Sequence, residues 1–106
     1  MATTAEFIEY VCERVKDTGS VRHKKMFGEY MIYVDDKPIL LVCDNTVYVK
    51  ILPCIGALMM DAERGCPYSG AKEHYILDTE NRDLTLDVVA ALLPVTPVPK
   101  PRKRKG

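Results

Sequence analysis

The stretch KKMFGEYMIYVDDKPILLVCDNTVYVK, residues 24–50, decides the fold class. From Tyr30 to Val34, successive side chains alternate between two faces with strand-forming residues on both, which is typical of a β-strand. Two short acidic turns, at residues 35–37 and 44–45, separate this segment from the next two apolar segments. Because turns this short join neighbouring antiparallel strands, the stretch predicts a three-stranded meander.

The middle segment, residues 39–43, is apolar on both faces and is predicted to be the central, most buried strand. Pro38 precedes it, at a strand start where proline is tolerated. Val47, Val49 and Ile51 alternate with polar residues and indicate a third strand with one buried face.

An amphipathic helix is predicted before the sheet. Thr3 and Glu6 fit a capping box at its start, and Gly19 stands where a left-handed C-terminal cap is expected. The apolar stripe recurs at helical spacing and consists of Phe7, Ile8, Val11 and Val15.

Two more helices are expected after the meander. Pro53 suits the first turn of one over residues 54–63, although Gly56 weakens it by about 1 kcal/mol relative to alanine. Residues 82–93 predict the other, which Pro94 ends. Candidates for its N-terminal cap are Asn81 and Asp83.

Between these helices, residues 74–77 predict a strand, and residues 68–70 suggest a short strand before it. The order is therefore α-β-β-β-α-β(β)-α. Antiparallel strands with helices on one face make an α+β two-layer sandwich.

The length of 106 residues suits one domain, predicted over residues 1–94. Residues 95–106 are predicted to be a proline-rich linker and a basic, disordered tail. The net charge of zero divides unevenly, since residues 1–99 hold 10 Lys+Arg and 15 Asp+Glu, or 10 − 15 = −5. The tail supplies five compensating positive charges: Lys100, Arg102, Lys103, Arg104 and Lys105.

Four cysteines without a C-x-x-C pair indicate reduced thiols in a cytoplasmic protein. The start of the chain lacks the apolar core of a secretory signal, and no apolar run approaches the ~20 residues of a membrane span. Zinc binding by Cys54, Cys66 and a histidine is a weaker alternative, because structural zinc sites favour tight ligand pairs. A disulfide is another, and it would require an oxidising compartment. The prediction is no metal and no cofactor.

The segment that begins with Met26-Phe27-Gly28 and runs to Val47-Tyr48-Val49-Lys50 resembles the N-terminal domain of the TfoX/Sxy competence-regulator family. Further blocks that resemble the family are Pro67-Tyr68, Gly70-Ala71-Lys72, His74-Tyr75 and the terminal Pro-Lys-Pro-Arg-Lys. The resemblance covers residues 1 to about 100. It implies a secretion-chaperone-like α+β fold and a relationship to bacterial regulators of DNA-uptake genes that are not enzymes. Those regulators carry a second, helical domain to which nothing in this sequence corresponds.

Three groups of residues are candidate sites. Arg22, Lys24 and Lys25, together with the five tail cations, form a hypothetical nucleic-acid-binding set, whose binding would be non-specific and salt-dependent. The alternative is a solvated edge and a solubilising tail. Gly28 and His74 mark an alternative small-molecule or enzymatic pocket. The competing interpretation is a β-bulge at Gly28 and a packed or solvent-facing histidine.

No catalytic residue is predicted, because nothing in the spacing joins His23 or His74 to a nucleophile. The sequence therefore predicts a non-enzymatic bacterial regulatory or adaptor domain. Its sheet face or edge would bind a protein partner or a second copy of itself as a homodimer, and no membrane. The basic tail would add weak, non-specific affinity for nucleic acid.

Overall fold

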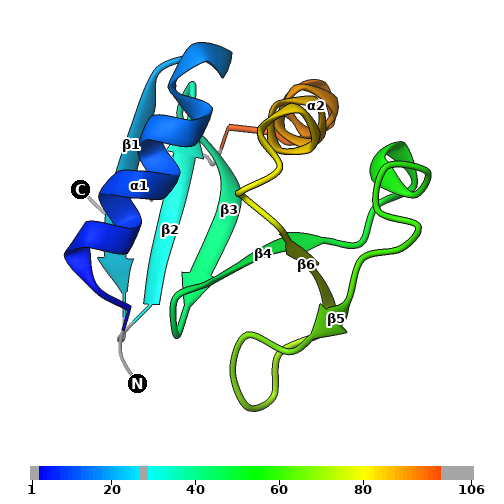
Figure 1. Ribbon diagram of the computed structural model, residues 1–106, viewed down its shortest axis with the longest axis horizontal. Helices are drawn as coiled ribbons and strands as arrows, with labels where there is room; N and C mark the ends of the chain where they lie inside the picture. Colours follow the sequence, from blue (N-terminus) through cyan, green and yellow to red (C-terminus); the bar gives the residue numbers. More distant parts are fainter. Residues whose placement is uncertain (1–2, 27–28, 99–106) are drawn as a thin grey trace, which may run out of the picture.

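The fold consists of two helices packed on one face of a single antiparallel sheet (Figure 1). The computed structural model describes residues 3–26 and 29–98. The helices are α1 (Ala5–Val15) and α2 (Arg82–Leu92). The strands are β1 (Val21–Met26), β2 (Glu29–Val34), β3 (Lys37–Cys43), β4 (Thr46–Lys50), β5 (Arg64–Gly65) and β6 (His74–Leu77), in the sheet order β1-β2-β3-β4-β6-β5. The predicted α+β two-layer fold with an antiparallel meander is confirmed, although the meander has four strands, β1 to β4, where three were predicted.

Two-residue turns join β2 to β3 and β3 to β4. Asp35 and Asp36 have φ values of 52° and 66°, and Asp44 and Asn45 have values of 54° and 56°. Two successive positive φ values make the type I′ geometry that matches the twist of a β-hairpin, and Asp and Asn tolerate it better than other non-glycine residues. The acidic turns therefore set the pairing next to each turn, and the β2–β3 register shifts between Ile32 and Tyr33.

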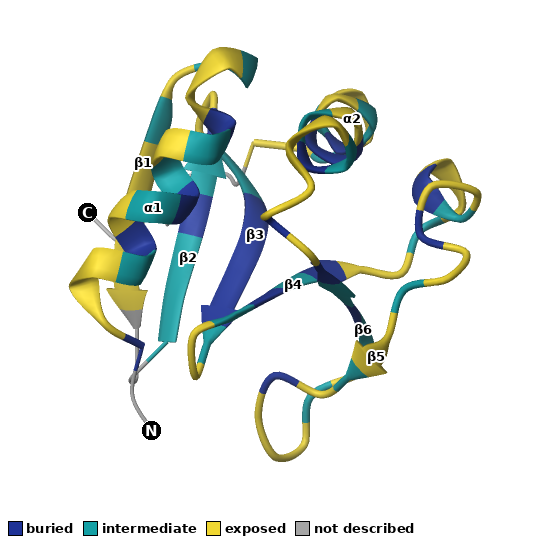
Figure 2. Cartoon of the chain, in the orientation of Figure 1, coloured by how far each residue is buried: buried dark blue, intermediate teal, exposed yellow. Residues whose placement is uncertain are grey.

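The core lies between the helices and the inner face of the sheet, where the dark blue residues of Figure 2 gather. β3 is its centre, since residues 39–42 are all buried, as predicted. The predicted stripe of α1 is also confirmed, with Phe7 half-buried and Ile8, Val11 and Val15 buried.

Two predictions about α1 are wrong in detail. Its N-cap is Thr4, whose hydroxyl accepts a hydrogen bond from the Phe7 N–H at 3.2 Å. The Thr3 hydroxyl instead accepts from the Asn45 N–H at 3.3 Å, and the Thr4 N–H donates to Asn45 Oδ1 at 3.0 Å. These bonds tie the start of α1 to the β3–β4 turn. Gly19 is extended, with φ of 160°, because a 3₁₀ turn over Lys16–Thr18 intervenes after the helix.

The predicted helix over residues 54–63 is not formed. A 3₁₀ turn covers Pro53–Ile55, and turns follow to Asp61. Residues 63–65 are drawn into the sheet instead, because β5 pairs with β6 and the Ile76 N–H donates to the Glu63 carbonyl at 2.8 Å. The few residues that remain, with Gly56 among them, are too short for a stable helix.

The extra strand also lies earlier than predicted, at β5 and not at residues 68–70. The last helix agrees with the prediction. Asn81 caps α2 by accepting from the Leu84 N–H at 3.1 Å, and a 3₁₀ turn that contains Pro94 follows the helix. None of the helices within residues 3–26 and 29–98 has the length and apolar character that a bilayer-spanning segment requires.

Candidate functional site

The three basic residues predicted to bind nucleic acid all lie on the edge strand β1, but they do not form one cluster. Arg22 is engaged, since its Nε donates to Asp36 Oδ1 at 3.1 Å and its guanidinium lies 4.4 Å from the centre of the Tyr33 ring. Lys24 and Lys25 are exposed and point to opposite faces of the sheet, because they are neighbours in a strand. The five tail cations and Gly28 lie outside the described residues. Nucleic-acid binding by this set stays a prediction.

His74 lies in β6, on the face of the sheet opposite the helices, where it pairs with Lys50 of β4. Its Nδ1 is 2.7 Å from the Lys72 carbonyl oxygen, and its ring makes an edge contact with Tyr48 at 6.4 Å between centroids. The other histidine, His23, packs against the Tyr30 ring at 5.8 Å. Among the described residues, no hydrogen bond joins either imidazole to the side chain of a cysteine, serine or threonine.

The four cysteines are free thiols, with Cys54 and Cys66 exposed and Cys12 and Cys43 half-buried. Burial raises the pKa of Cys12, and the nearby Glu9 carboxylate raises it further. Burial likewise raises the pKa of Cys43, with smaller contributions from Asp44 and Glu29. A raised pKa leaves these two thiols protonated near neutral pH, where they are weak nucleophiles. Within the part of the chain that the structure describes, no three His, Cys, Asp or Glu side chains are grouped as metal ligands.

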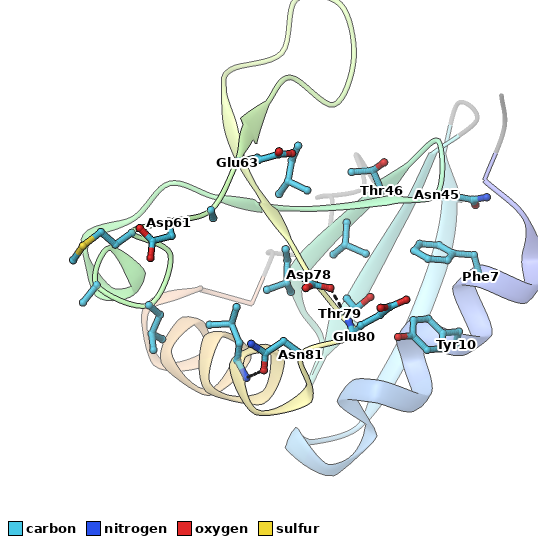
Figure 3. A pocket seen from close by; sticks show the side chains of 18 residues that line it. Phe7, Tyr10, Asn45, Thr46, Asp61, Glu63, Asp78, Thr79, Glu80 and Asn81 are labelled. Carbon is cyan, nitrogen blue, oxygen red and sulfur yellow. Dashed lines mark hydrogen bonds between the residues drawn. The ribbon is translucent and has the colours of Figure 1, made fainter.

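The described residues form a cleft of about 740 Å³ on the helix-covered side of the sheet (Figure 3). Val47 of β4 and Leu77 of β6 belong to its floor. Phe7 and Tyr10 project into it from α1, and Leu84 lines it from the first turn of α2. The loop after the Pro53–Ile55 turn makes the opposite wall with residues 57–63. The cleft residues thus come from four separate parts of the chain.

The walls of the cleft expose apolar side chains. Met60 is 76% exposed and Leu58 is 37% exposed, and both lie in the loop over residues 57–63, where a helix was predicted. Their neighbours Ile55 and Met59 are fully buried and hold this loop on the core. An apolar patch beside a concavity is typical of a binding surface.

The cleft is also acidic. Four exposed carboxylates line it: Asp61, Glu63, Asp78 and Glu80. Asp78 Oδ1 accepts from the Glu80 N–H at 3.1 Å, while the side chains of Asp61, Glu63 and Glu80 make no ion pair or hydrogen bond with any described residue. No described lysine or arginine lines the cleft. Arg14 contacts one of the lining residues, since its Nε donates to the Tyr10 hydroxyl at 3.1 Å.

The residues that line the cleft are apolar, polar and acidic. Among the described residues that line it there is no histidine, cysteine, serine or lysine, while Tyr10, Thr46 and Thr79 supply hydroxyl groups. What the cleft offers is apolar area, a few polar side chains and four negative charges.

The cleft was not predicted from the sequence, which directed attention to Gly28 and His74. No sequence pattern in the meander or in the two helices predicts a cavity, because the residues of its walls come together only in the folded chain. One signal did exist: the charge of −5 over residues 1–99, whose 15 acidic residues include the four cleft carboxylates.

Comparison with known proteins identifies the family. The TfoX N-terminal domain matches residues 13–80, which include all six strands and the 57–63 wall of the cleft. The chain is also 35% identical, over 107 aligned positions, to an uncharacterised 12.7 kDa protein encoded in the trpE 5′ region of Spirochaeta aurantia; the alignment covers 99% of this chain and 93% of that protein. The alignment thus spans both helices of this chain as well as the sheet. On both grounds, the chain belongs to the TfoX N-terminal domain family.

Proposed function

We propose that this chain is a non-enzymatic regulatory adaptor domain that binds a protein partner in the cleft. The observation that carries the proposal is the cleft itself, in which the exposed Leu58 and Met60 stand beside carboxylates that have no partner among the described residues. Exposed apolar side chains and unpaired like charges do not stabilise the free domain, so a bound partner accounts for both. Membership of a family named for competence regulators supports a regulatory role, in transcription or DNA uptake.

The tail from Lys100 to Lys105 is proposed to add non-specific affinity for nucleic acid. Five cations that neutralise phosphates give a slope of up to about −4.5 in log K against log salt. Retention on DNA at low salt, compared between the full chain and a chain ending at residue 99, tests this role. Equal retention would remove it.

Site-specific photocrosslinking in the host bacterium tests the adaptor function. A photoreactive amino acid at Met60 is expected to capture a discrete protein partner, because this side chain is exposed inside the cleft. The matched control is the same amino acid at Ala90, which is exposed on α2 and does not line the cleft. Identical captured proteins at the two positions, or none at either, would contradict the proposal. Sedimentation velocity at micromolar concentration separates a different partner from a second copy of the chain.

The volume of the cleft favours one other function. About 740 Å³ lies within the roughly 300–1,000 Å³ that small-molecule sites occupy. A domain that senses a small organic cation is therefore the second candidate. A thermal-shift screen of amines and other cationic metabolites tests it, and saturable stabilisation that is lost on neutralising Glu63 and Glu80 would establish it in place of the protein partner.

A further inference from the structure

We propose that the outer face of the sheet, which is the face opposite α1 and α2, binds single-stranded nucleic acid. Bases stack on the Arg22–Tyr33 pair and on Tyr48. Lys24 and Lys50 contact the phosphates. This surface is separate from the cleft, so the inference does not depend on what the cleft binds.

A row of four large side chains crosses the outer face. The antiparallel register pairs Met31 with Leu41, Leu41 with Tyr48, and Tyr48 with Ile76. Directly paired residues point to the same face of a sheet. None of the four belongs to the core cluster that the helices cover, so the row lies on the side that neither helix packs against. It gives the outer face an apolar centre on which flat bases can lie.

The first stacking position is the pair formed by Arg22 of β1 and Tyr33 of β2. These residues are directly opposite each other, and the guanidinium lies over the tyrosine ring, 4.4 Å from its centre. The Arg22 side chain is 56% exposed, so a base can reach the guanidinium from solvent. Unpaired bases stack on tyrosine rings and on guanidinium planes, whereas a base inside a duplex is already stacked.

The second stacking position is Tyr48 of β4, whose ring is half-buried and stands at 88° to the imidazole of His74. Tyr48 lies two strands from Tyr33 and two residues along the strand direction, or about 12 Å away. Two positions at this separation receive two different bases of one strand. The outer face therefore favours a single strand over a duplex.

The charge of the outer face fits a phosphate backbone. Among the described strand residues on this face are three Lys or Arg, namely Arg22, Lys24 and Lys50, and one carboxylate, Glu29. Lys24 and Lys50 are exposed and make no ion pair or hydrogen bond with any described residue. Ammonium groups placed in this way bind phosphates and release their counterions. The same excess of positive charge opposes a second copy of the chain packed face to face.

Fluorescence anisotropy with the full chain tests the stacking. The probes are a labelled ten-nucleotide single strand, as DNA and as RNA, and the matching DNA duplex. Tyr33→Leu and Tyr48→Leu should each lower affinity for the single strand at least about fivefold and leave affinity for the duplex within about twofold. The control is Tyr10→Leu, which removes a half-buried tyrosine from the helix-covered side and should change neither affinity. Unchanged single-strand affinity, or equal losses for single strand and duplex, would overturn the inference.

Two neighbouring lysines give a second test that leaves the packing intact. Lys24→Gln and Lys25→Gln remove the same charge from opposite faces of β1, and both side chains are exposed. Lys24→Gln should reduce the magnitude of the slope of log K against log salt for the single strand by about 0.7, and Lys50→Gln should do the same. Lys25→Gln should leave the slope unchanged. Equal changes at Lys24 and Lys25 would show that only the overall charge attracts nucleic acid, which would overturn the assignment of the outer face.

Two other outcomes would also overturn it. If single-strand binding is lost in a chain ending at residue 99 and is unaffected by every outer-face variant, the basic tail alone binds nucleic acid. If sedimentation velocity shows a dimer that Tyr48→Leu dissociates, the outer face binds a second copy of the chain. Both outcomes leave the adaptor function of the cleft untouched, because its photocrosslinking test reads a different surface.

Discussion

Replacing Lys37 by methionine is expected to lower the free energy of unfolding by more than the same replacement of an ordinary surface lysine would. Lys37 opens β3, and its Nζ donates to the Leu93 carbonyl at 2.7 Å, across 56 positions of the sequence. Carbonyl groups at the end of a helix lack partners within it, and a cation there also interacts favourably with the helix dipole. The lysine therefore fastens the end of α2, whose first turn lines the cleft, to the sheet.

The magnitude follows from the environment of this bond. A hydrogen bond that involves a charged group contributes about 1.5–3 kcal/mol when it is buried. This bond is only partly buried, and the Thr96 N–H approaches the same carbonyl at 3.4 Å, so the lower part of that range applies. We expect a loss of about 1–2 kcal/mol in the free energy of unfolding, or roughly 5–10 °C in Tm for a domain of this size.

Urea unfolding followed by circular dichroism measures the effect. Methionine keeps the apolar stem of the lysine, so the variant removes the ammonium group and little packing. The control is Lys50→Met, which removes an equal charge from an exposed strand position. Free energies of unfolding that agree within about 0.3 kcal/mol for the two variants would refute this account of Lys37.

Three further predictions concern single positions. Gly19→Ala should cost about 1 kcal/mol of stability in thermal melts, because the new Cβ would lie 2.7 Å from Asp35 Oδ1. The cost should be smaller when Asp35 is also replaced by alanine. An equal cost in both backgrounds would contradict this contact. Asn81→Ala should lose about 1 kcal/mol by removing the cap of α2, while Asn81→Asp should lose little; equal losses would contradict the capping role. Iodoacetamide at pH 8 should alkylate the exposed Cys54 before Cys12, because burial and the Glu9 carboxylate raise the pKa of Cys12. The difference between the two alkylation rates should shrink as the pH rises toward that pKa. Equal rates at pH 8, measured by mass spectrometry, would contradict the shift.

The parts of the fold that the sequence predicts are those set by local chemistry. The Asp-Asp and Asp-Asn turns adopt positive φ and determine the hairpins, and the apolar run from Ile39 to Val42 becomes the buried centre. The segment over residues 54–63 shows the limit of such reasoning. Its helical spacing is real, since Ile55 and Met59 are both buried, but pairing of β5 with β6 takes its last residues. A tertiary contact therefore overrides a weak local preference.

The candidate site was less predictable than the fold for the same reason. Phe7 and Tyr10 line the same cleft as Asp78 and Glu80 only because the folded chain brings α1 and the β6–α2 connection to it. No spacing in the sequence joins positions this far apart. What the sequence does contain is an excess of acidic residues, and the fold converts that excess into a local charge on one cleft.

Charge variants distinguish the two proposed activities better than salt does, because salt weakens both charge-assisted partner binding in the cleft and DNA binding by the tail. Neutralising Asp61, Glu63 and Glu80 changes the charge of residues 1–99 from −5 to −2. Affinity for the protein captured by crosslinking at Met60 should then fall about tenfold while DNA retention rises, since a less negative body repels phosphate less. A control variant that neutralises Glu9, Glu73 and Asp87, which do not line the cleft, should raise DNA retention equally and leave affinity for that protein unchanged. If both affinities fell together in the cleft variant, one surface would be binding both partners, and the separation of an acidic cleft from a basic tail would be wrong.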